Sequence, residues 1–154
     1  MASLVVALVA VGVAIAAWLR PVPESSPPPP PSEPTYSDQQ IAKAKANVCE
    51  AYNTVSHAVL VNTHRPNPVP GDDVGALAAA ANGRLALYAG GDYLLDRLAA
   101  NPAAPGGLVK AIRSLANQSK EIGIAFLADE PDSVQEPLRR ALDADVATID
   151  GLCQ

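Results

Sequence analysis

Aromatic side chains are scarce in this chain of 154 residues: they make up 4% of it, although 49% of the residues are hydrophobic. Alanine supplies most of the hydrophobic excess, and a small side chain buries little area at roughly 25 cal/mol per Å². A core of such residues requires close approach of the backbones, which suits helices better than sheets. Strand-like alternation of β-branched residues is also missing, so the sequence favours an all-α fold.

Clustered cations are missing as well. The formal net charge is −5, and the densest cationic positions are Lys43 with Lys45 and Arg139 with Arg140, all on helix-like stretches. Proteins that bind nucleic acid neutralise several phosphates with grouped Lys and Arg side chains. We therefore expect no nucleic-acid partner and interpret these cations as solvated helix faces.

The sequence also lacks the usual motifs of catalysis and metal binding. Serine nucleophile motifs, phosphate-binding loops and the CxxC and HxxxH spacings of metal ligands do not occur. The two histidines, His57 and His64, fall on one helix face with Glu50, but a spacing of seven residues separates the side chains by about 10 Å. We expect no metal, no cofactor and no enzymatic activity.

The first twenty residues predict a membrane anchor. Ala2 to Leu19 carry no charge, and a helix of this length spans about 27 Å, close to the hydrocarbon thickness of a bilayer. Trp18 sits where an interfacial aromatic is expected at the end of a membrane helix, and Arg20 follows it. A cleaved signal peptide, cut at the small residues Ala14 to Ala16, is the alternative, but its apolar core is usually shorter and follows a basic segment. A start site further upstream also stays open.

Proline is concentrated directly after this segment. Eight of the fourteen residues from Pro21 to Pro34 are proline, which excludes helix and sheet. Residues 21–35 are therefore predicted to form a polyproline-II stalk of roughly 40 Å. A docking peptide for a PxxP-binding module is the alternative.

Four helices, separated by proline-containing breaks, are predicted in residues 36–154 as an antiparallel up-down bundle. Ser37 and Gln40 form a capping box at the start of the first, and Asp72 or Asp73 caps the second, which runs to about Leu98. Pro137 fits only a first turn, so the fourth helix is expected to begin near Ser133 or Glu136. The predicted apolar stripes of the four helices are, in order, Ile41, Ala44, Val48, Ala51, Val55, Ala58 and Asn62; Leu77, Ala81, Leu85, Tyr88, Leu95 and Leu98; Leu108, Ile112, Leu115, Ser119, Ile122 and Phe126; and Leu138, Leu142, Val146, Ile149 and Leu152.

The second of these helices contains an unusual group of glycines, Gly83, Gly90 and Gly91. Each costs about 1 kcal/mol relative to alanine inside a helix. Either they allow close contact with another helix or the Gly90–Gly91 pair marks a kink, and we favour close contact.

The two cysteines, Cys49 and Cys153, predict a disulfide bond. In an up-down bundle the start of the first helix and the end of the fourth lie at the same pole, so the two side chains can meet. The bond would close a loop of about 100 residues, worth up to ~4.7 kcal/mol. Two unrelated thiols are the alternative. Because disulfides persist in oxidising compartments, this prediction places the bundle outside the cytoplasm.

The segments "VCEAYNTVSHAVLVNTHRPNP", "NGRLALYAGGDYLLDRLA" and "IDGLC" resemble an uncharacterised family of actinobacterial membrane-anchored, alanine- and proline-rich helical proteins. The resemblance covers Tyr36 to Cys153 and implies a location and a fold, without an activity or catalytic residues.

The expected function is a structural or protein-binding role in the cell envelope. The alternative is a ligand-binding protein for haem or lipid, with a pocket between helices lined by Tyr88, Tyr93 or Phe126. The sequence makes no prediction about the oligomeric state.

Overall fold

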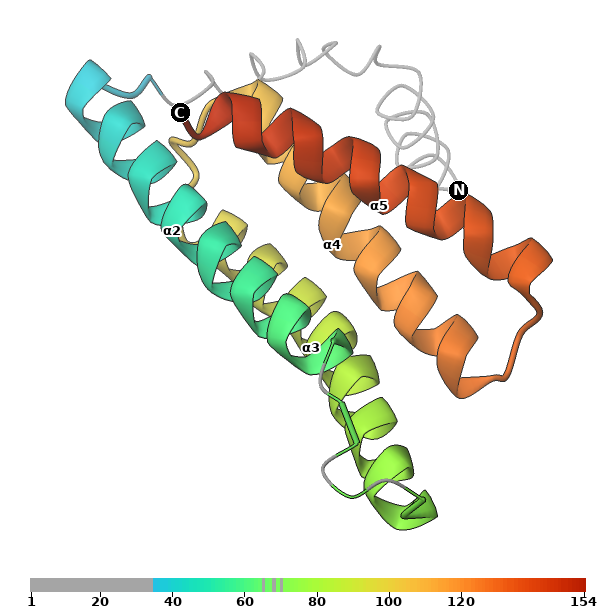
Figure 1. The fold of residues 1–154 in the computed structure, drawn as a ribbon. Helices are drawn as coiled ribbons and strands as arrows, with labels where there is room; N and C mark the ends of the chain where they lie inside the picture. The colour runs from blue at the N-terminus through green and yellow to red at the C-terminus, as the bar shows by residue number, and fades with distance from the viewer. Residues whose placement is uncertain (1–34, 65, 68, 70) are drawn as a thin grey trace, which may run out of the picture. The chain divides into compact units, whose positions relative to one another are not determined.

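A computed structural model describes residues 35–64, 66, 67, 69 and 71–154. This part of the chain contains four helices, α2 (Asp38–Thr63), α3 (Asp73–Ala99), α4 (Gly106–Leu127) and α5 (Asp132–Leu152), and no strand. Consecutive helices run in opposite directions (Figure 1). The prediction of an all-α, four-helix fold is thus confirmed for the described residues, whereas the predicted anchor, and the predicted stalk up to Pro34, lie outside them. None of α2 to α5 combines the length and apolarity that crossing a bilayer requires.

Polar side chains define where α2 and α3 begin. The Ser37 hydroxyl accepts a 3.3 Å hydrogen bond from the Gln40 amide, and the Ser37 amide donates a 2.8 Å hydrogen bond to Gln40 Oε1. This is the predicted capping box. At α3, the Asp72 carboxylate accepts a 3.1 Å hydrogen bond from the Val74 amide, so Asp72 is the capping residue.

The start of α5 lies one residue before Ser133, one of the two predicted positions, but the expectation that Pro137 falls in the first turn is wrong. The helix begins at Asp132, and Pro137 lies in its second turn instead of its first. The Pro131 carbonyl accepts hydrogen bonds from the amides of Val134 and Gln135, which starts the helix early. Pro137 then leaves only the Ser133 carbonyl without its usual helical donor, and solvent can satisfy that group because Ser133 is exposed.

Helix α4 has an inner face close to the one predicted. Leu108, Ile112 and Leu115 are buried on it, and Ser119 and Ile122 continue the same face. Helix α4 packs against α3 and α5, and α3 packs against α2. The core lies between these helices, and its buried members are Val48, Cys49, Ala51, Tyr52, Val55, Leu94, Leu98, Leu108, Ala111, Ile112, Leu115, Ala116 and Ile149.

The predicted stripe of α3 is largely wrong. Leu77, Ala81, Leu85 and Tyr88 are exposed, Leu95 is half-buried, and only Leu98 is buried. The inner face consists instead of Gly83, Leu87, Gly91, Leu94 and Leu98. Between Asp73 and Asp92 this helix carries a single charge, on Arg84. Because both sides are apolar, hydrophobic periodicity does not distinguish the inner face from the outer one.

Glycine selects the inner face of α3. A Cβ atom added at Gly91 would lie 2.5 Å from the Ala116 carbonyl oxygen of α4, and one added at Gly90 would lie 2.7 Å from a methyl group of Val55 in α2. Helix α3 continues without interruption through both positions. The glycines therefore allow close helix contact, as predicted.

The Gly91 contact predicts a steep cost for a single methyl group. Gly91→Ala should lower the free energy of unfolding by about 1 to 3 kcal/mol, because the Ala116 backbone must move away. Gly151→Ala is the matched control, since a Cβ atom there meets nothing within 4 Å. It should be neutral or stabilising by up to about 1 kcal/mol. Urea denaturation followed by circular dichroism measures both, and equal effects would contradict the packing argument.

Candidate functional site

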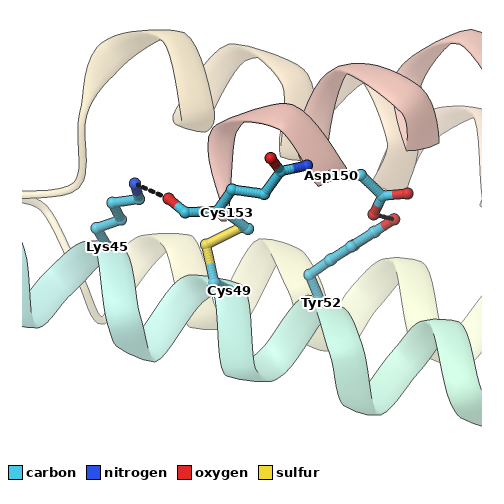
Figure 2. The surroundings of a disulfide bond; sticks show 6 residues. Lys45, Cys49, Tyr52, Asp150 and Cys153 are labelled. Atoms are coloured by element: carbon cyan, nitrogen blue, oxygen red, sulfur yellow. Dashed lines mark hydrogen bonds between the residues drawn. A yellow bond between two sulfur atoms is a disulfide. The ribbon is translucent and has the colours of Figure 1, made fainter.

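A disulfide bond joins the middle of α2 to the end of α5 (Figure 2). Cys49 and Cys153 lie with their Cα atoms 5.7 Å apart, although 104 positions separate them in the sequence. Helix α5 ends at Leu152, and Cys153 directly after it meets Cys49, about three turns after the start of α2 at Asp38. The predicted disulfide is confirmed.

Two polar contacts lie on either side of this bond along α2 (Figure 2). The Tyr52 hydroxyl donates a 2.7 Å hydrogen bond to Asp150 Oδ1, and Lys45 Nζ donates a 3.2 Å hydrogen bond to the Gln154 carbonyl oxygen. Lys45, Cys49 and Tyr52 occupy successive turns of one helix face. Together they attach the C-terminal end of α5 to α2.

Tyr52 is the buried polar member of this attachment, with 3% of its surface exposed. Burial raises the pKa of its hydroxyl to about 12, and the hydrogen bond to the Asp150 carboxylate acts in the same direction. Both effects favour the neutral phenol, which alone can donate to the carboxylate. The contact is therefore intact at neutral pH.

Away from the disulfide, the described parts of α2 and α5 form no packing interface comparable to those of the sequence-adjacent helices. A groove of about 500 Å³ lies between them, called here the α2/α5 groove. Ile149 is the buried residue of α5, while Leu142 is half-buried and Val146 is exposed. The residues that line the groove are Tyr52, Asn53, Val55, Ser56, Val59, Leu60, Thr63, His64, Leu87, Leu115, Ser119, Leu142, Asp143, Val146 and Asp150.

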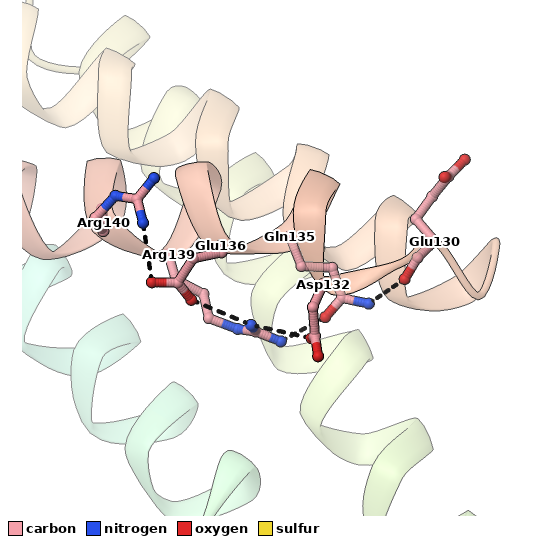
Figure 3. Close-up of polar contacts among 6 residues, drawn as sticks. All are labelled: Glu130, Asp132, Gln135, Glu136, Arg139 and Arg140. Carbon is pink, nitrogen blue, oxygen red and sulfur yellow. Dashed lines mark hydrogen bonds and ion pairs between the residues drawn. The ribbon is translucent and has the colours of Figure 1, made fainter.

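The first turns of α5 are held separately by ion pairs (Figure 3). Arg139 lies 3.5 Å from carboxylate oxygens of both Asp132 and Glu136, and Arg140 lies 3.1 Å from Glu136. These groups are largely solvent-exposed, so each pair contributes at most about 1 kcal/mol. They stabilise the helix start without attaching it to α2.

Two of the three aromatic residues proposed for a ligand pocket line separate grooves. Tyr93 lines a groove of about 560 Å³ between α2 and α3, and Phe126 lines another of about 430 Å³ near the start of α3. Tyr88 lines neither groove, and its ring centroid lies 5.3 Å from Lys120 Nζ. Lys120 also donates a 2.6 Å hydrogen bond to Asp92, which raises the pKa of the lysine.

The histidines lie at separate places along α2. His57 is exposed on the helix, as is Glu50, and His64 is the residue that ends the helix. His64 Nδ1 lies 3.1 Å from the Leu60 carbonyl oxygen. In the part of the chain that the structure describes, no three His, Cys, Asp or Glu side chains are grouped closely enough to hold a metal ion.

Comparisons with known proteins give no assignment: no family model, no curated protein and no solved structure matches the chain. The resemblance to actinobacterial membrane-anchored proteins therefore stays a prediction.

Two surfaces were missed by sequence reasoning. One is the α2/α5 groove, whose existence depends on the divergence of two helices that are not adjacent in sequence. The other is the α3 outer face, defined by Val74, Leu77, Ala81, Leu85 and Tyr88, all of which are exposed. The scarcity of charge between Asp73 and Asp92 is the signal from which the second surface could have been found.

The pKa of Tyr52 predicts how stability changes in alkali. The folded-state pKa of about 12 lies above the ordinary value of 10.0, so the contribution of this residue is complete below pH 10 and is lost as the pH rises from 10 to 12. The loss should reach roughly 2 to 3 kcal/mol. Tyr52→Phe should lack this component and show a flatter profile in urea titrations across that range. If the free energy of unfolding fell equally with pH in both proteins between pH 10 and 12, the raised pKa would not belong to Tyr52.

Proposed function

We propose that this chain is a single-pass membrane-anchored protein whose helical bundle lies outside the cytoplasm and docks another protein of the cell envelope. The bundle would stand on the proline-rich stalk, and its role would be structural or protein-binding. The observation that carries this proposal is the apolar α3 outer face.

The α3 outer face is exposed to an unusual degree for its composition. Val74, Leu77 and Leu85 have 76%, 65% and 63% of their surface exposed. A helix that is apolar on all sides is normally buried on all sides, within a protein or a membrane. Here one side contacts α2 and α4, and the other is left for a partner.

Neighbouring helix α4 extends this apolar surface. Gly123 of α4 lies against Arg84 and Tyr88 of α3. A Cβ atom added at Gly123 would be 3.5 Å from the Arg84 carbonyl oxygen and 3.6 Å from Tyr88 Cβ, which is ordinary van der Waals contact. Ile124 and Leu127, one residue and one turn further along α4, are 50% and 62% exposed. Exposed apolar side chains grouped in this way are typical of protein interaction sites, and the small Ala81 allows a partner helix to approach closely.

The proposed location rests on the disulfide and on the sequence. Disulfide bonds such as Cys49–Cys153 form and persist mainly in oxidising compartments. The uncharged segment from Ala2 to Leu19 favours a retained anchor, and the resemblance to membrane-anchored proteins points the same way.

Binding of a hydrophobic ligand, haem or lipid, is the second candidate function. It is favoured by the grooves that Tyr93 and Phe126 line, whose volumes of about 560 and 430 Å³ fall in the range of small-molecule sites. Extraction of the purified protein with organic solvent, followed by mass spectrometry, tests it. A stoichiometric lipid or porphyrin would favour this function over protein docking.

If the α3 outer face docks an envelope protein, a photoreactive residue on this face should crosslink to that protein, and one elsewhere on the bundle should not. A photoreactive amino acid at Leu85 should yield a discrete adduct with an envelope protein in intact cells, because Leu85 lies on the α3 outer face. The added substitution Leu77→Lys should reduce that adduct by roughly tenfold or more, since it places a charge in the contact. Ala144, exposed on α5, is the matched control position for both the photoreactive group and the lysine.

Intact mass measurement of the same preparation tests the location. The protein should be recovered from the membrane fraction with residues 1–20 retained and with Cys49 and Cys153 bridged. Equal crosslinking from positions 85 and 144 would contradict docking through α3, and a mass lacking the apolar segment would contradict the anchor.

A further inference from the structure

We infer that the α2/α5 groove is a second docking site, and that its occupant is an amphipathic helix with a basic polar face, supplied by a partner protein. This site is distinct from the α3 outer face, so the inference goes beyond the proposed function. It rests on three properties of the groove: its apolar floor, its acidic edge and its length.

The floor of the groove is built from all four helices. Val55 and Val59 come from α2, Leu87 from α3, Leu115 from α4 and Leu142 from α5. Leu60 and Val146 lie higher on the walls, and both are exposed. Away from the disulfide, helix α5 thus directs an apolar face towards α2 without packing against it, and the space between them suits apolar side chains from a partner.

The edge of the groove carries negative charge. Asp143 and Asp150 line it on α5, and no Lys or Arg is among the residues that line it. Arg139, one turn before Asp143, is turned towards Asp132 and Glu136 (Figure 3). His64, at the end of α2, is the one basic side chain of the lining. An apolar floor with an acidic edge is complementary to a helix that carries leucines on one side and lysines or arginines beside them.

The dimensions suit a short helix. Tyr52 and His64, the outermost groove residues of α2, are about 18 Å apart along the helix axis, which corresponds to roughly three helical turns. The Tyr52–Asp150 hydrogen bond lies at the disulfide end, where α2 and α5 are held together. A partner helix in this position would lie between α2 and α5 as a further member of the bundle, with anchors spaced i, i+3, i+4 and i+7.

A pair of synthetic helices tests the inference. One peptide of about 14 residues carries leucines at the anchor spacing and lysines elsewhere, and the other replaces every lysine by glutamate. Each is labelled and titrated with the oxidised full-length chain in phosphatidylcholine nanodiscs, with empty nanodiscs as the blank, and binding is followed by fluorescence anisotropy. The lysine peptide should bind at least roughly tenfold more tightly than the glutamate peptide.

Two variants locate the binding site. Asp143→Lys should weaken binding of the lysine peptide by roughly tenfold and reduce its salt dependence, since it reverses a charge at the edge of the groove. Val146→Lys should abolish binding, because it places a charge on the apolar wall. Both positions are exposed, so neither change should impair folding, which circular dichroism checks. Glu121→Lys, exposed on α4, repeats the charge reversal outside the groove and should leave binding unchanged.

Several results would overturn the inference. They are equal affinity for the two peptides, unchanged affinity in the two groove variants, or loss of affinity in Glu121→Lys. Binding of palmitate to the groove with no binding of either peptide would reassign it to lipid. A Leu77→Lys variant should bind the peptide normally, so failure of this inference and failure of docking through α3 are distinguishable.

Discussion

The Cys49–Cys153 bond is the constraint on which the arrangement of the other helices depends. Helix α5 packs mainly on α4, and Ile149 is its one fully buried side chain. Without a covalent link, little apolar burial would hold its end against α2. Closing a loop of this size is worth up to ~4.7 kcal/mol in the chain-entropy model, more than the Tyr52–Asp150 hydrogen bond contributes. The disulfide therefore holds α2 and α5 together at the C-terminal end of α5. Away from it, the two helices are separated by the α2/α5 groove.

Two unpartnered surfaces follow from this geometry. Because α2 and α5 meet only at the disulfide pole, the apolar face of α5 opens on a groove instead of a closed core. Because glycines draw one face of α3 onto α2 and α4, the leucines on its opposite face, such as Leu77 and Leu85, remain outside. Both surfaces are apolar, and the groove also carries Asp143 and Asp150 in its lining without any Lys or Arg. They are accordingly proposed for partners of different chemistry.

The parts of the fold that local physics dictates could be predicted from the sequence. The capping box at Ser37 depends on residues three apart, and the inner face of α4 depends on a regular apolar spacing within one helix. The disulfide could be predicted because the chain has two cysteines, so each has one possible partner within the chain. The up-down topology brings the start of the first helix and the end of the fourth to the same end of the bundle. The outer face of α3 could not be predicted, because leucine and alanine occur on all sides of this helix. Which side faces inward is set by the close approach of Ala116 and Val55 to its glycines. The groove could not either, because it depends on the angle between helices that are distant in sequence.

One covalent bond holds the end of α5 to α2, and hydrogen exchange measured with and without reductant tests this most directly. In the oxidised protein the amides near Ile149 should be protected. After reduction their protection should fall by roughly 100-fold, corresponding to about 2.7 kcal/mol, while amides of α4 around Ile112 retain theirs. Unchanged protection of α5 on reduction would contradict the account, because it would show that packing alone holds this helix in place.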